Sequence, residues 1–102
     1  MEALAADPGS DTELKVSRKV TIKNRLGLHA RAAAKLAMAA QAFKADVSLY
    51  HEQFEADVRS ILSLISLGCA YNSEVVLQAA GEDASDALKT LTAIIENRFG
   101  EE

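Results

Sequence analysis

The chain has 102 residues, a length that fits one small domain with its own hydrophobic core. Its formal net charge of −4 argues against nucleic acid or an anionic membrane as the main partner, although one local phosphate site remains compatible with it. A single cysteine, Cys69, excludes an internal disulfide, and its apolar neighbours suggest a small buried hydrophobe. With only two histidines, far apart in sequence, no metal site is expected.

No segment is apolar for long enough to suggest a membrane helix. The longest apolar stretch, around residues 61–70, is interrupted by Ser63, Ser66 and Gly68. The N-terminus lacks a basic region followed by an apolar one, so it does not resemble a secretory signal. We therefore expect a cytoplasmic protein without membrane insertion.

The first predicted element follows a tail. Residues 1–14 contain proline, glycine, serine and acidic residues without periodicity, and they are predicted to be disordered in front of a domain spanning residues 15–102. At the start of that domain the odd positions are polar, while the even positions are apolar with one exception. Val16, Val20 and Ile22 therefore predict a strand with one buried face.

A helix and two strands are predicted next. Residues 30–43 show apolar residues at helical spacing, residues 46–50 alternate as a strand, and residues 54–57 form a short strand. Residues 51–53 are a predicted turn in which His51 is solvated. The buried stripe of the helix is expected to be Ala33, Leu36, Ala37, Ala40 and Phe43.

A second, shorter helix is predicted over residues 60–67. Ser60 is of a type favoured at the N-cap position, and Gly68 is of the type that ends helices. A turn at residues 72–73 then leads into a β-branched strand over residues 74–80.

The last predicted helix covers residues 84–99. Asp83 and Ser85 are both suitable caps, and Gly100 ends the helix. Its buried stripe is expected to be Ala84, Ala87, Leu88, Leu91, Ile94, Ile95 and the aliphatic stem of Arg98.

The predicted order is therefore β-α-β-β-α-β-α. Strands with one apolar face and three amphipathic helices favour the α+β class, as an open-faced two-layer sandwich. We expect a four-stranded, mostly antiparallel sheet with the three helices on one face.

His29 lies where the first strand gives way to the first helix. An isolated histidine at a helix start most often makes a cap or core hydrogen bond, but its neighbours favour phosphate chemistry. Gly27 permits a tight turn or close approach of another backbone, and Arg31 supplies a forked donor for phosphate oxygens. Backbone N–H groups at a helix start also attract anions. An imidazole, partly unprotonated near neutral pH, can act there as the nucleophile toward an activated phosphoryl group.

The motif Leu26-Gly27-Leu28-His29-Ala30-Arg31 and the predicted element order resemble the histidine-containing phosphocarrier protein (HPr) family of the bacterial phosphoenolpyruvate:sugar phosphotransferase system. The resemblance runs from about Val16 to Phe99. A second motif, residues 59–68, resembles the family's regulatory-serine helix, and residues 81–84 before the last helix are also similar.

The resemblance implies a carrier without enzymatic activity of its own. His29 would accept a phosphoryl group from phosphorylated enzyme I, as a pros-phosphohistidine, and donate it to an enzyme IIA domain. Arg31 matches the arginine that helps to hold the phosphate. Neither a cofactor nor a metal is expected, and a monomer is expected.

Regulation and docking are also implied by the resemblance. Ser60 matches the serine phosphorylated by an ATP-dependent HPr kinase/phosphorylase in some bacteria, although a plain N-cap role is equally compatible with its position. Family partners contact the helix after the active histidine and the short helix, whose core contribution needs only Leu64 and Leu67. The expected docking residues are Ala30, Ala34, Ile61, Leu62 and Ile65.

Two features depart from the family pattern. Ala32 stands where the family usually has proline, which should loosen the helix start by up to ~1 kcal/mol through the entropy of the unfolded chain. Basic residues are also fewer than is usual in the family: Met38, Gln41 and Ser63 stand where basic residues might be expected, while Lys35 and Lys44 remain.

Two other functions remain open on the sequence alone. The first is a regulatory HPr paralogue in nitrogen or carbon control that acts through Ser60 and the exposed apolar patch. The second is a ferredoxin-like module that binds a small molecule or nucleic acid. The acidic net charge and the lack of an aromatic stacking platform count against nucleic acid.

Overall fold

The computed structural model describes residues 15–101, and the predicted tail at residues 1–14 lies outside them. Four strands form one sheet in the spatial order β2-β5-β3-β4, in which all neighbouring pairs are antiparallel. The strands are β2 (Lys15–Thr21), β3 (Asp46–His51), β4 (Phe54–Asp57) and β5 (Glu74–Ala80). The predicted antiparallel sheet is confirmed.

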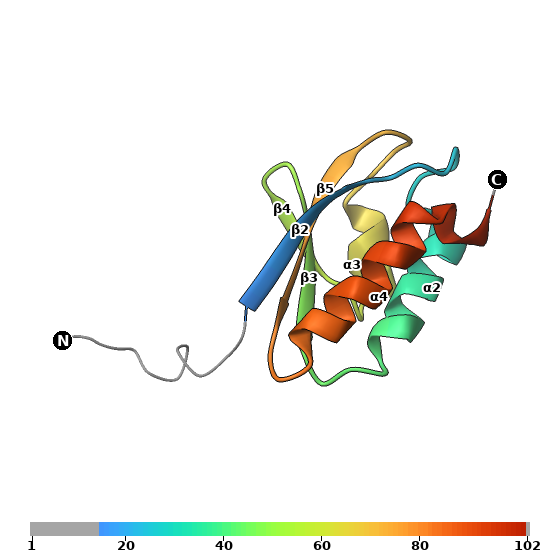
Figure 1. Ribbon diagram of the computed structural model, residues 1–102. Coiled ribbons are helices and arrows are strands. Elements are labelled where there is room, and N and C mark those ends of the chain that lie inside the picture. Colours follow the sequence, from blue (N-terminus) through green and yellow to red (C-terminus); the bar gives the residue numbers. More distant parts are fainter. Residues whose placement is uncertain (1–14, 102) are drawn as a thin grey trace.

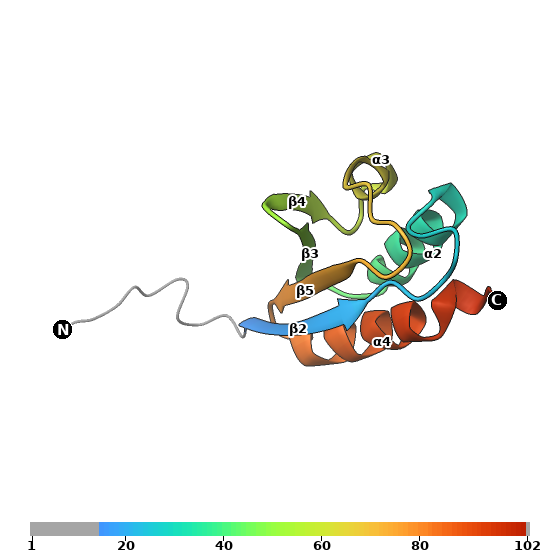
Figure 2. The ribbon, with the colours of Figure 1, turned by 90° about the horizontal axis from the view of Figure 1, so that it is seen from above.

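Three helices cover one side of this sheet and leave its other side open (Figure 1, Figure 2). They are α2 (Ala30–Ala40), α3 (Ile61–Ser66) and α4 (Ala84–Glu96), and a short 3₁₀ turn, η1 (Arg98–Gly100), follows the last of them. Helix α4 packs along β2 and β5, while α2 lies between α3 and α4. The predicted two-layer sandwich and its element order are therefore confirmed.

The hydrophobic core lies between the two layers, and the strand register aligns it. Leu49 on β3 pairs with Leu77 on β5 and with Ala56 on β4, and all three side chains are buried. Val20 on β2 pairs with Val75 on β5 in the same way. Alternate residues of each strand thus face the helices, because side chains on a strand point to opposite faces in turn.

Helix α2 ends at Ala40, three residues earlier than predicted. The N–H groups of residues 41–43 donate to carbonyls three residues back, a tighter turn than the α-helix. Beyond that turn, Arg59 donates through Nη2 to the carbonyls of Phe43 and Ala45 at 2.7 and 2.9 Å. The predicted buried stripe is confirmed for its four helical members, while Phe43 is half-buried.

The end of α4 also differs from the prediction. The helix stops at Glu96, after which Arg98 and Phe99 take positive φ angles of 57° and 55°. This left-handed turn rotates the chain so that Phe99 is 1% exposed and Arg98 lies on the surface. The prediction that the stem of Arg98 belongs to the buried stripe is therefore wrong.

His51 is the other correction. It is the last residue of β3, and its side chain is only 14% exposed instead of solvated. Its Nδ1 lies 3.1 Å from the carbonyl oxygen of Leu67, which directly follows α3. A partner 16 residues away in sequence thus buries a side chain that its own turn would leave in water.

Two of the three predicted caps, Ser60 and Asp83, lie at helix starts, although they act differently, while Ser85 lies inside α4 and is not a cap. Ser60 is the N-cap of α3, and its Oγ accepts from the N–H of Ser63 at 3.2 Å. Asp83 occupies the N-cap position of α4, but its carboxylate accepts from the N–H groups of Lys44 and Ala45 at 2.9 and 2.8 Å. It thereby ties the loop after α2 to the start of α4.

Candidate functional site

His29 is the N-cap residue of α2. Its carbonyl accepts the first helical hydrogen bond, from the N–H of Ala33 at 2.8 Å, and its Nδ1 accepts from the N–H of Arg31 at 3.3 Å. About a quarter of the side chain is exposed. The predicted position of this imidazole at the start of the helix is confirmed.

Gly27 allows the loop before His29 to pass close to another segment. Its φ of +71° is in the left-handed region, and a Cβ here would lie 2.5 Å from the carbonyl oxygen of Cys69. That carbonyl accepts from the N–H of Leu28 at 2.9 Å. Both predicted uses of the glycine, the turn and the close approach, are therefore present together.

Asn24 holds the same loop from within. It is fully buried, and its Nδ2 donates to the carbonyl of Gly27 at 2.7 Å and to Oε1 of Glu101 at 3.0 Å. One side chain thus links the loop before His29 to the end of the described chain. Neither Asn24 nor Glu101 was predicted as a site residue.

Glu101 contacts the far side of the imidazole. Its Oε2 lies 2.6 Å from Nε2 of His29. An ionised carboxylate can only accept, so the hydrogen must be on Nε2. In the neutral ring Nδ1 then keeps its lone pair, in agreement with its role as acceptor from the N–H of Arg31.

The charge on Glu101 is favoured by its surroundings. Partial burial opposes ionisation, but hydrogen bonds from Asn24 and His29, together with the positive charge of Arg31, outweigh it and lower the pKa of Glu101 below its usual value. The carboxylate therefore remains an acceptor at neutral pH.

The left-handed turn at the chain end positions this carboxylate. Phe99 is buried in the core, and its carbonyl accepts from Nζ of Lys35 on α2 at 2.6 Å. Together these contacts bring Glu101 beside the start of α2. No sequence pattern near His29 could have found a partner 72 residues away.

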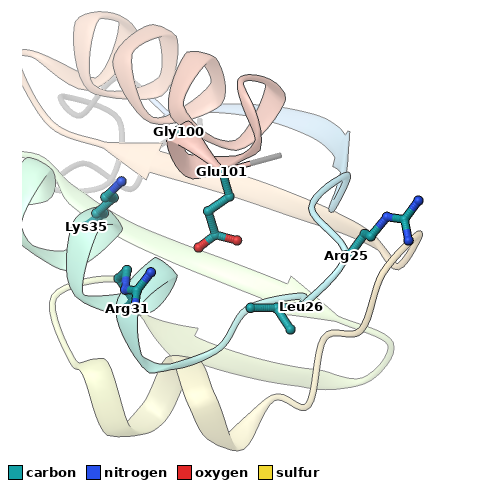
Figure 3. A pocket seen from close by; sticks show the side chains of 6 residues that line it. All are labelled: Arg25, Leu26, Arg31, Lys35, Gly100 and Glu101. Carbon is teal, nitrogen blue, oxygen red and sulfur yellow. The ribbon is translucent and has the colours of Figure 1, made fainter.

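A pocket of about 500 Å³ opens next to this pair. Figure 3 shows Arg31 and Lys35 projecting from α2, Arg25 and Leu26 on the preceding loop, and the carboxylate of Glu101 between them. The pocket therefore carries three cationic side chains and one carboxylate, which is already bonded to Asn24 and His29. This excess of positive charge favours the binding of an anion in the pocket.

The predicted docking residues lie on two adjacent helices. Leu62 on α3 is 78% exposed, and Ile61 and Ile65 are each 37% exposed, whereas Leu64 is fully buried. On α2, Ala30 is exposed and Ala34 is half-buried. Because α2 packs against α3, this apolar surface adjoins the helix that carries His29.

Two further exposed apolar side chains were not predicted. Leu26 and Met38 are about 70% exposed, although they precede and follow His29 in segments that otherwise bury their large apolar residues.

In the described residues 15–101, no three His, Cys, Asp or Glu side chains gather as metal ligands, and no helix is long and apolar enough to cross a membrane.

Comparison with known proteins decides the family. The profile of the PTS-HPr family, described as the PTS HPr component phosphorylation site, matches residues 16–97. The chain belongs to the HPr family. The resemblance stated on the two sequence motifs is thus confirmed over most of the chain.

The similar proteins include some named phosphocarrier protein HPr and some named phosphocarrier protein NPr. The chain is 41% identical over 86 residues to phosphocarrier protein HPr of Cupriavidus necator, covering 84% of this chain and 97% of that one. It is 39% identical over 87 residues to phosphocarrier protein NPr of Shewanella violacea, covering 85% and 96%.

Solved structures agree with this assignment. A crystal structure of HPr from Thermoanaerobacter tengcongensis matches with a TM-score of 0.82 and 36% identity, covering 85% of this chain and 98% of that one. The open-faced sandwich described above is therefore the HPr fold.

Proposed function

We propose that this chain carries a phosphoryl group on Nδ1 of His29, received from phosphorylated enzyme I and passed to an enzyme IIA domain. The observation that carries the proposal is the hydrogen bond between Nε2 of His29 and Glu101, because it leaves the lone pair on Nδ1. Membership of the HPr family, whose profile covers the His29 segment, supports the same residue.

The transfer step needs only groups of this chain and the donor. The Nδ1 lone pair attacks the phosphorus of the donor's phosphoryl group, the Nδ1–P bond forms, and the donor–P bond breaks with its electron pair returning to the donor. The ring becomes positively charged, and the carboxylate of Glu101 stabilises that charge through Nε2–H. Donation to the next protein is the reverse process.

Arg31 is proposed to stabilise the transferred group. Its N–H already points at Nδ1, and its guanidinium lines the cationic pocket beside His29. The charge of a loose phosphoryl transition state is spread over three oxygens, so donors next to Nδ1 lower its energy. The chain then acts as a cytoplasmic, monomeric carrier that depends on its partner proteins for catalysis and needs no cofactor.

Partner docking is proposed on the surface formed by Ala30, Ala34, Ile61, Leu62 and Ile65. Exposed apolar side chains on a helix next to a reactive group are typical of a protein-binding site. The contact of α2 with α3 supports a single surface shared by both helices.

Ser60 is proposed as a regulatory phosphorylation site for an HPr kinase/phosphorylase. Its Oγ accepts from the N–H of Ser63 and is 3.0 Å from Oγ of Ser63, so modification must replace these bonds. A dianion at the start of a helix is tolerated, while its charge would disturb docking on Ile61 and Leu62.

A regulatory role without sugar transport is a second candidate. It is favoured by relatives named NPr, among them those from Shewanella violacea and Proteus mirabilis, of which the first is 39% identical to this chain. The same chemistry at His29 would then serve nitrogen or carbon control instead of sugar uptake.

Incubation with enzyme I and radiolabelled phosphoenolpyruvate tests the carrier. The expected label is acid-labile and base-stable, is lost in His29→Ala, and is retained in the matched control His51→Gln. Absence of label with the cognate enzyme I, or label that survives in His29→Ala, would overturn the proposal. Transfer of the label onward to sugar-specific or to regulatory enzyme IIA domains distinguishes sugar transport from regulation. Incubation with ATP and the HPr kinase/phosphorylase tests Ser60 separately, since phosphoserine gives an acid-stable label.

A further inference from the structure

Asn24 contributes only the nitrogen end of its side-chain amide to the site. Its Nδ2 carries two hydrogens, and both have acceptors: the carbonyl oxygen of Gly27 at 2.7 Å and Oε1 of Glu101 at 3.0 Å. The side chain is fully buried, and among residues 15–101 no group donates to its Oδ1. Since an unpaired buried acceptor is unfavourable, the donor end is what this position supplies.

The carbonyl group of Gly27 fixes which end of the amide faces Glu101. If the amide were turned around, its oxygen would take the place of Nδ2, 2.7 Å from the carbonyl oxygen, and two acceptors would face each other. The loop holds that carbonyl in place, because it also accepts from the N–H of His29 at 2.9 Å. Asn24 therefore presents a hydrogen-bond donor, and not an acceptor, to Glu101.

Glu101 connects this donor to the imidazole. Its two oxygens face different partners, Oε1 toward Nδ2 of Asn24 and Oε2 toward Nε2 of His29 at 2.6 Å. Figure 3 shows the side chain reaching from the chain end toward the segment that holds Leu26 and Arg31. A carboxylate accepts from both donors at once, whereas a side chain with one accepting and one donating end satisfies only one of them. The hydrogen stays on Nε2 only if the side chain at position 101 accepts there.

We propose that Asn24 is a positioning residue for His29 and acts through Glu101. Its Nδ2–H holds one oxygen of the carboxylate and disfavours a hydrogen on that oxygen, so the other oxygen faces Nε2 and accepts from it. The lone pair then stays on Nδ1, where it accepts from the N–H of Arg31 at 3.3 Å. This role rests on the proposed function, in which Nδ1 attacks the phosphoryl group.

The variant Glu101→Gln distinguishes this role from a merely structural one. The new amide can turn its oxygen toward Asn24 and its nitrogen toward Nε2 of His29, or the reverse. In the reverse arrangement its nitrogen faces Nδ2 of Asn24, donor against donor. The first arrangement should therefore predominate, and most of the neutral imidazole should carry its hydrogen on Nδ1, as measured by its ¹⁵N shifts. A majority with the hydrogen on Nε2 would overturn the proposal.

Removing Asn24 in the same background is the second arm. In the double variant Asn24→Ala, Glu101→Gln the preference for the first arrangement is lost, while the N–H of Arg31 still favours a lone pair on Nδ1. The ratio of the two tautomers should shift back toward hydrogen on Nε2 by about fivefold, the effect of one hydrogen bond, and phosphorylation should be faster than in Glu101→Gln alone. A structural role predicts the opposite, a double variant more impaired than either single one. Asn97→Ala, an exposed asparagine at the same chain end, is the matched control and should restore nothing.

The two measurements separate this role from the proposed function. Glu101→Gln retains Asn24, so its tautomer ratio decides the matter even if the loss of the buried amide in Asn24→Ala prevents folding. If the tautomers respond to Asn24 as expected but enzyme I labels none of the proteins, the proposed function fails and the link from Asn24 to His29 stands. If His29 is labelled but its tautomers do not respond to Asn24, the positioning role alone is overturned.

Discussion

Oε2 of Glu101 lies 2.6 Å from Nε2 of His29, and the two residues are 72 positions apart in sequence. The contact determines which imidazole nitrogen carries the hydrogen and which carries the lone pair. A nucleophile at the start of α2 therefore depends on the last described residue of the chain, which the left-handed turn at Arg98 and Phe99 brings back to the site.

Replacing this carboxylate tests the dependence. Glu101→Gln should leave His29 as a mixture of two neutral tautomers, visible in its ¹⁵N shifts, because an amide can donate or accept at Nε2. Phosphorylation of His29 should slow by at least about tenfold, because a hydrogen bond to a charged group contributes about 1.5–3 kcal/mol and 1.4 kcal/mol corresponds to a factor of about ten in rate. Glu96→Gln on the exposed side of α4 is the control. An unchanged tautomer in Glu101→Gln would contradict this account.

Two glycines with similar positive φ angles allow steric crowding to be separated from backbone strain. Gly27→Ala should destabilise the fold by about 2–3 kcal/mol, because its Cβ would meet the carbonyl oxygen of Cys69 at 2.5 Å and its φ is +71°. Gly68→Ala should cost only about 1 kcal/mol, since its φ is +67° but nothing lies within 4 Å of the added Cβ. Denaturant unfolding of both variants measures the difference, and equal losses would refute the close approach.

The pH dependence of stability should report on Asp83. Hydrogen bonds from the N–H groups of Lys44 and Ala45 lower the pKa of Asp83, in spite of partial burial, which opposes the shift. A lowered folded-state pKa stabilises the protein above the unfolded value of about 3.9, and this contribution is lost as the pH falls through the folded value. Asp83→Asn should therefore be less stable than the unchanged protein at neutral pH, and the gap should close in acid. Glu82→Gln, one residue earlier and exposed, should show no such gap.

Cys69 should be an inert thiol. Burial, together with the nearby negative charge of Glu52, raises its pKa to about 11. Near pH 8 its reaction with a thiol reagent should be at least about 100-fold slower than that of a cysteine placed at the exposed Ser85 position, because the thiolate is the reacting form. Equal rates would mean that the α3–β5 loop opens readily.

Neighbouring leucines on α3 should separate docking from folding. Leu62→Ser removes an exposed side chain and should weaken transfer to partners while stability changes by less than about 0.5 kcal/mol. Leu64→Ala empties a fully buried position and should cost about 2–5 kcal/mol of stability. Titration against enzyme I and thermal unfolding of both variants check the pair. Unchanged transfer in Leu62→Ser would remove Leu62 from the docking surface.

The amino-acid sequence by itself determined the element order, the buried face of the first strand and the position of His29 at a helix start. These features follow from local rules, because side chains alternate along a strand and recur at a period of 3.6 along a helix. The same rules correctly assigned Ser60 to a cap and Leu62 to the surface.

Only the tertiary structure decided what lies beside His29. Asn24 and Glu101 show no local pattern, since their partners are brought together by the close approach at Gly27 and by the burial of Phe99. The same limit explains the two wrong predictions of burial. His51 is buried because it contacts the carbonyl of Leu67, which is distant in sequence, and Arg98 is exposed because Phe99 enters the core in its place. Local spacing thus predicted which residue can act as the nucleophile, while contacts between distant segments determined which of its nitrogens keeps a lone pair.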